Sequence, residues 1–221
     1  MNQTIHNLLT EQLVSWETAR NNYAALSGVQ VKELNVNGIL YKVQFNPARI
    51  VSSGAKVDAK SIKERKCFLC PANLPAEQKG IPFEGHYNIL VNPFPIFPRH
   101  LTIPETAHVN QRISPRFGDM LDYGQATLWH LNDTPRTTLV IESADRKTAI
   151  KLLDIVYHSL DIQPGEDEPM MNVLGMYEAG KWIVFIFPRA KHRPACYTAE
   201  GDANLLSSPA SVDLGGVFIT P

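Results

Sequence analysis

The stretch that decides the fold reads K-C-F-L-C-P-A-N-L-P at residues 66–75, N-I-L-V-N-P-F-P-I-F-P at residues 88–98 and R-H-L-T-I-P-E-T-A-H at residues 99–108. A Cys-x-x-Cys pair comes first, and the apolar run at residues 87–91 predicts a buried strand. The prolines that follow remove backbone donors and keep the chain extended, so they predict a stiff turn. A second strand over residues 99–103 leads to a histidine. This order predicts a metal site beside a turn that can wall a ligand.

Cys67 and Cys70 are predicted to be two ligands of a metal ion. Thiolates bind Zn²⁺ strongly, and a tight turn lets two cysteines at this spacing face one ion. The third cysteine, Cys196, leaves an uneven set that does not suit a secreted disulfide framework. Two alternatives stay open, namely a redox pair at the start of a helix, against which Pro71 argues, and two buried thiols that bind nothing.

His108 is predicted to be the third metal ligand. It follows the strand over residues 99–103 by a few residues, which returns the chain toward the cysteines. His100 is its rival. Because His100 precedes the alternating Leu101 and Ile103, we expect its side chain to point to the face opposite theirs.

The composition describes an ordinary globular protein. The chain has 221 residues, 44% hydrophobic and 19% charged, with a formal net charge of -1. Such a balance gives no basic surface for nucleic acid, so we expect no nucleic-acid partner. No window approaches the ~20 apolar residues that span a bilayer, and the first residues lack a signal sequence. We therefore expect no membrane partner and a cytoplasmic protein.

Hydrophobic patterning predicts an α+β chain. The strongest local signal is Asn37-Gly38 between two β-rich runs, which predicts a type I′ hairpin because both central residues need positive φ. The chain ends on an apolar run of strand character. Predicted helices cover residues 4–26, 59–64, 110–121 and 146–160, and predicted strands cover residues 29–36, 39–45, 87–91, 99–103, 137–142, 170–177, 181–187 and 217–221.

Basic side chains follow the predicted strand at residues 181–187. Cations clustered at the end of a strand favour anion binding, although plain surface charge is the alternative. Arg49, in the polar segment after residue 45, is a further phosphate-binding candidate, with a solvated loop as its alternative. The cluster consists of Arg189, Lys191, His192 and Arg193.

Three stretches resemble the branch of the histidine-triad superfamily that contains galactose-1-phosphate uridylyltransferase, diadenosine tetraphosphate phosphorylase and GDP-L-galactose phosphorylase. Residues 67–73, C-F-L-C-P-A-N, are similar to the uridylyltransferase zinc knuckle. Residues 88–97 are similar to the strand and turn that hold the nucleotide, and residues 100–108 to the second strand of the triad unit. Residues 172–197 are similar to the C-terminal part of a bacterial group in this branch.

The resemblance implies a histidine-triad-like antiparallel sheet with flanking helices, as one sheet or as two pseudo-repeated halves. It implies structural Zn²⁺ at Cys67, Cys70 and His108, with Asn92 and Pro93 lining the base and ribose pocket. The basic cluster would neutralise phosphate charge. Activity would be nucleotidyl transfer or phosphorolysis of a nucleoside-diphosphate sugar or dinucleoside polyphosphate. The partner would be a small phosphorylated nucleotide, and relatives in this branch are often homodimers.

One departure from the family pattern concerns the nucleophile. These enzymes carry H-x-H-x-Q or H-x-H-x-H, whose central histidine attacks the α-phosphorus, but no two histidines here are separated by one residue. Residues 124–132, G-Q-A-T-L-W-H-L-N, occupy the expected position, so no catalytic residue is predicted. We expect a single domain over residues 1–221 that misses an internal segment near residues 123–125 and a C-terminal extension. The alternative is a non-catalytic zinc- and nucleotide-binding protein.

Overall fold

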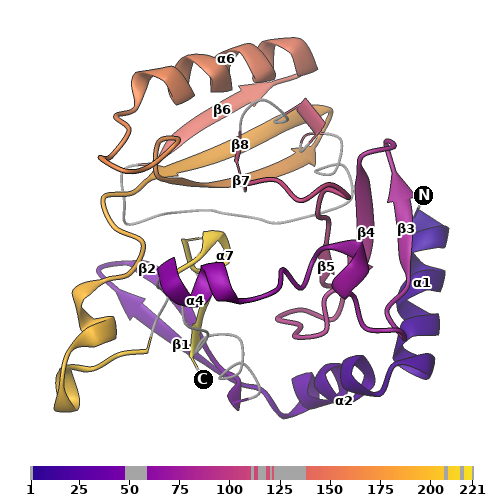
Figure 1. The fold of residues 1–221 in the computed structure, drawn as a ribbon. Helices are drawn as coiled ribbons and strands as arrows, with labels where there is room; N and C mark the ends of the chain where they lie inside the picture. The colour runs from indigo at the N-terminus through magenta and orange to yellow at the C-terminus, as the bar shows by residue number, and fades with distance from the viewer. Residues whose placement is uncertain are drawn as a thin grey trace. The chain divides into compact units, whose positions relative to one another are not determined.

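The structure is a computed structural model that describes residues 2–47, 59–110, 112–113, 118–119, 121, 138–206, 209–214 and 217–220. These residues form two compact units, and Figure 1 shows their helices and strands. Unit 1 contains Met1–Gln30, Phe45–Asn110 and Pro221, and unit 2 contains Val31–Gln44 and Gln111–Thr220. The chain is α+β, as the sequence predicts, and its strands form three small antiparallel sheets. The single domain over residues 1–221 stays a prediction.

Unit 1 begins with two helices where the sequence predicts one. α1 (Asn2–Ser15) and α2 (Glu17–Ala25) are separated by Trp16, whose backbone is extended at φ -117 and ψ 104. The prediction of a continuous helix over residues 4–26 is therefore wrong at this residue. Trp16 is only 5% exposed and Ala19 is fully buried, so the corner buries a large indole that a straight helix would place differently.

The buried side chain of Gln12 ties α1 to the segment before the sheet. Its Nε2 donates to the Glu77 carbonyl at 2.9 Å, and its Oε1 accepts from the Lys79 backbone N–H at 2.9 Å. Gln12 is 0% exposed, and these bonds satisfy both ends of its amide. Apolar residues of α1, Leu8 and Leu9, pack with Val91 of the sheet.

The sheet of unit 1 has the order β3-β4-β5 and is antiparallel, with β3 at Gly80–Phe83, β4 at Tyr87–Val91 and β5 at Leu101–Thr102. β4 matches its predicted bounds and is central and buried, whereas β5 is shorter than predicted. β3 was not predicted. Its Pro82 is compatible with a strand because β3 lies at the edge, where a missing donor breaks no second ladder. α4 (Ala59–Glu64) forms as predicted.

Unit 2 contains the predicted Asn37-Gly38 hairpin. β1 (Gln30–Val36) and β2 (Ile39–Phe45) are joined by these two residues with φ of 55 and 87, which confirms the turn chemistry. β9 (Val217–Thr220) extends the sheet in the order β1-β2-β9. α7 (Ser211–Leu214) precedes β9, and the buried Asp213 carboxylate accepts from the backbone N–H groups of Ala210 and Ile219.

The second sheet of unit 2 has the order β6-β8-β7, with β6 at Leu139–Ser143, β7 at Met171–Glu178 and β8 at Lys181–Pro188. α6 (Arg146–Ser159) lies on one face of this sheet in Figure 1. Asp145 begins α6, because its side chain accepts from the Thr148 N–H at 2.8 Å. The core between helix and sheet consists of Leu121, Ile141, Ala149, Leu153, Val184 and Ile186.

Two predictions made from the sequence concern residues that lie largely outside the described part of the chain. Of the helix predicted over residues 110–121, Gly118, Asp119 and Leu121 are described and helical, whereas residues 110 and 112–113 are described and not helical, so the predicted start of this helix is wrong. Residues 124–132, where the family motif would stand, are not among the described residues. Within the described ranges, no helix combines the length and apolar character that crossing a membrane requires.

Candidate metal centre

A tight turn in unit 1 presents the two cysteines of the Cys-x-x-Cys pair. The Cys70 backbone N–H donates to the Cys67 carbonyl at 3.3 Å and closes the turn. The Asn73 side chain donates to the same carbonyl at 2.8 Å, and the Asn73 N–H donates to the Cys70 carbonyl at 2.8 Å. Pro71 starts the 3-10 helix Pro71–Asn73 that follows, so no α-helix begins at the pair. This geometry differs from a redox pair placed at the start of an α-helix.

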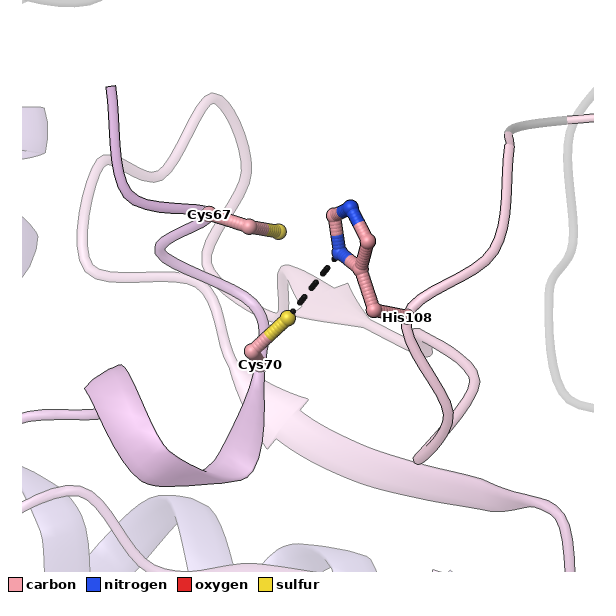
Figure 2. Close-up of side chains that lie close together, drawn as sticks. All are labelled: Cys67, Cys70 and His108. Carbon is pink, nitrogen blue, oxygen red and sulfur yellow. Dashed lines mark hydrogen bonds between the residues drawn. The ribbon is translucent and has the colours of Figure 1, made fainter. Parts of the chain in front are cut away.

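The chain beyond β5 brings His108 to this turn. Thr106 holds that segment, since its N–H and its hydroxyl both donate to the His86 carbonyl, at 2.8 and 3.0 Å. His108 Nδ1 then lies 3.1 Å from Cys70 Sγ. Figure 2 shows the side chains of Cys67, Cys70 and His108 pointing toward one another.

Cys67, Cys70 and His108 form a group that could hold a metal ion. One ligand atom from each lies within 4.8 Å of the others, and the two thiols and one imidazole are donors that divalent transition metals accept. The cysteines are half-buried and His108 is exposed. The sequence thus predicts which three residues the structure brings together.

In the metal-free protein, local contacts shift the pKa values of the two thiols in opposite directions. The hydrogen bond from the Leu69 backbone holds the pKa of Cys67 below its ordinary value. Burial, followed by the hydrogen bond with Cys67, raises the pKa of Cys70. Of the pair, Cys67 is therefore the thiol that ionises more readily.

Asn92, a predicted nucleotide contact, holds the proline-rich turn together. Its Oδ1 accepts from the Phe94 N–H at 2.9 Å, and its Nδ2 donates to Thr102 Oγ1 at 3.0 Å. The neighbouring Pro93 carbonyl accepts from Asn22 Nδ2 of α2 at 2.8 Å. The turn is therefore fixed from within and by α2, which suits a rigid ligand wall.

His100, the rival metal ligand, lies in that turn and outside the metal group. Its Nδ1 accepts from the Ile96 N–H at 3.2 Å, which places the proton of a neutral ring on Nε2. The Tyr23 hydroxyl donates to the His100 carbonyl at 2.9 Å. Burial raises the pKa of Tyr23 to about 12. No sequence signal pointed to Tyr23 or Asn22, because both act through tertiary contacts alone.

The predicted phosphate-binding residues after β8 belong to unit 2, and Arg189 has a clear structural task there. Its guanidinium donates to Asn172 Oδ1 at 2.8 Å, to the Pro209 carbonyl at 3.0 Å and to the His192 carbonyl. These bonds tie β7 to the loop that follows β8. The Arg193 guanidinium lies 3.9 Å above the Tyr197 ring, and Lys191 is exposed.

His192 lines an open cavity of about 250 Å³ together with Glu166, Glu168, Pro169, Met170 and Met171. Burial, and then the charges of Arg189 and Arg193, lowers the pKa of His192. The carboxylates of Glu166 and Glu168 line the same cavity and would repel an anion bound there. Arg49 lies outside the described residues, so its predicted role has no structural description.

One family model matches the chain, over residues 8–131, and its description is Domain of unknown function (DUF4922). The matched range includes the whole metal group and the proline-rich turn. No curated protein and no solved structure matches the chain.

Proposed function

We propose that this chain, which belongs to the DUF4922 family, is a zinc-stabilised nucleotide-binding protein with a histidine-triad-like fold. The observation that carries the proposal is the convergence of Cys67, Cys70 and His108 to within 4.8 Å. The resemblance of residues 67–73 and 88–108 to the uridylyltransferase branch supports the nucleotide part of the proposal.

The donor set favours zinc. Ligand atoms bound to one tetrahedral Zn²⁺ at about 2.3 Å for sulfur and 2.0 Å for nitrogen are roughly 3.5–3.8 Å apart. The distance from Cys70 Sγ to His108 Nδ1 is 3.1 Å, so small side-chain rotations make room for the ion. A bound zinc would cross-link the knuckle to the segment after β5, which stabilises the ends of the sheet of unit 1.

The nucleotide would lie against the proline-rich turn, with its base and ribose at Asn92 and Pro93. The turn is well suited to this role because its shape is fixed before binding, so little ordering is needed when a ligand arrives. That basic residues bind the phosphates of this nucleotide stays a prediction. These residues are Arg49, Arg189, Lys191, His192 and Arg193.

Zinc content tests the metal part. We expect about one zinc per chain after purification without added metal. Cys67→Ser, Cys70→Ser and His108→Ala should each lose it, whereas Cys196→Ser should keep it, since Cys196 is a half-buried thiol of the other unit. Retention of zinc by all three ligand variants would place the metal elsewhere and overturn the site.

Calorimetric titration with GDP, UDP and ADP tests the nucleotide part. Asn92→Ala should weaken binding about tenfold or more. Thr102→Val removes the acceptor of the Asn92 Nδ2 bond but keeps the amide, so it measures how much of that loss comes from a loosened turn rather than from a lost contact. Absence of heat for all three nucleotides with the zinc-loaded chain would reject nucleotide binding.

Nucleotidyl transfer or nucleotide phosphorolysis is the activity that the resemblance of residues 67–73 and 88–108 implies. The covalent step needs a histidine in line with the phosphorus, and no two histidines of this sequence are separated by one residue. We therefore expect no phosphorolysis of GDP-hexose or diadenosine tetraphosphate by this chain. Turnover with inorganic phosphate would establish the enzyme class and require a different nucleophile.

A further inference from the structure

The Cys67–Cys70 turn brings two thiols together where reagents can reach them. Both cysteines are free and half-buried, and their sulfur atoms lie within 4.8 Å of each other. The turn does not depend on the sulfurs, because the Cys70 N–H and the Asn73 amide bond the Cys67 carbonyl instead. The backbone therefore holds the pair in place whether or not the thiols change chemically.

The backbone of this turn suits a disulfide. A turn closed by a hydrogen bond from residue i+3 to residue i keeps the two Cα atoms within about 7 Å. Natural disulfides join Cα atoms about 4.4–6.8 Å apart, with an S–S bond of about 2.05 Å. The 3.3 Å bond from the Cys70 N–H to the Cys67 carbonyl closes such a turn, so the backbone keeps the two cysteines close to the separation that a disulfide spans.

We propose that Cys67 and Cys70 form a thiol–disulfide modification site that peroxides oxidise and that releases the bound metal. The metal-release part rests on the zinc site proposed above, whereas disulfide formation needs only the two thiols. A disulfide is a far weaker zinc ligand than two thiolates, because its sulfur atoms carry no negative charge.

The chemistry balances with hydrogen peroxide as the oxidant. One thiolate sulfur attacks a peroxide oxygen, the O–O bond breaks, and the hydroxide that leaves takes a proton to become water. The second sulfur attacks the resulting sulfenic acid, the S–S bond forms, the S–O bond breaks, and a second water leaves. Two electrons pass from the sulfurs to the peroxide, and a metal ion held by this group would lose both of its thiolate ligands.

The test compares the wild-type chain with Cys196→Ser, purified with their zinc and treated with increasing hydrogen peroxide. A chromogenic chelator follows zinc release, intact mass follows oxidation, and peptide mapping locates the bond. We expect the intact mass to fall by about 2 Da in both proteins. In the wild type, two of the three cysteines should no longer react as free thiols. Zinc release should track disulfide formation in both proteins, and dithiothreitol with added zinc should restore the starting state.

Cys70→Ser provides the matched negative variant, because it keeps Cys67 but removes its partner. Oxidation there should give no bond within the knuckle. Two results in the wild-type chain would overturn the proposal. One is a mass gain of about 32 Da on a knuckle cysteine instead of the 2 Da loss, and the other is a disulfide that uses Cys196. Absence of zinc before oxidation would overturn the proposed metal site alone, since a 67–70 disulfide in that zinc-free protein still supports the modification site.

Discussion

Replacing Leu153 with alanine tests whether α6 holds the second sheet of unit 2 through its apolar face. Leu153 is 3% exposed and packs in the cluster with Ile141, Val184 and Ile186. Complete burial of a leucine contributes about 1.5–3 kcal/mol, and a Leu→Ala cavity that cannot collapse raises the cost to about 2–5 kcal/mol. Two strands and a helix surround this side chain, so we expect a loss near 3 kcal/mol in the free energy of unfolding, roughly mid-range.

Leu152→Ala is the matched control, since Leu152 is the adjacent residue of the same helix and is 38% exposed. Both substitutions change helix propensity by the same amount, so that contribution cancels between them. The control leaves no enclosed cavity and should cost less than about 1 kcal/mol. The difference between the variants therefore isolates the cavity and packing energy of the core.

Urea unfolding measures both values, with Trp182 as a fluorescent reporter because it packs against this cluster and donates to the Leu121 carbonyl. The denaturant slope should stay constant if only the native core has changed. Amide hydrogen exchange in α6 should quicken in Leu153→Ala and not in the control. Equal losses for the two variants would refute the packing of α6 on this sheet.

Three further outcomes follow from local geometry. Gly80→Ala should lower stability by about 1 kcal/mol in thermal unfolding, because its Cβ would lie 2.1 Å from Asn88 Oδ1; adding Asn88→Ala should remove most of that cost. Ala179→Asn should raise stability by about 1 kcal/mol, because Ala179 has φ 50 in a two-residue hairpin, and Asn37→Ala should have the opposite effect. The pKa of Tyr23 is raised to about 12 from 10.0. The contribution of Tyr23 to the free energy of unfolding should therefore be complete below pH 10 and disappear as pH rises through 12. Ultraviolet titration of the tyrosine, together with unfolding curves at each pH, checks this.

Elements with a complete local signal were predictable from the sequence. The hairpin at Asn37-Gly38 follows from two residues that tolerate positive φ, and α6 follows from its apolar period. The metal group was predictable because the cysteine spacing fixes a turn and the strand order returns His108 toward it.

The rest depended on contacts that no local pattern contains. The apolar pattern of the sequence continues through Trp16, but the helix breaks there. The burial of the Trp16 indole explains the break. The Asn92 amide was expected to contact ligand, and its bonds to Phe94 and Thr102 are fixed by the sheet. Arg189, likewise expected to meet phosphate, donates to groups that become neighbours only after β7 and β8 pair.

The buried Gln12 has a consequence for the order in which the chain can fold during synthesis. Its partners at residues 77 and 79 are 65 and 67 positions further along, so a growing chain that has made α1 cannot yet satisfy this amide. At about 5–20 residues per second, the ribosome needs roughly 3–13 s to supply them. Until then the apolar side of α1 has no sheet to cover, so Leu8 and Leu9 lack the Val91 contact that buries them in the folded unit.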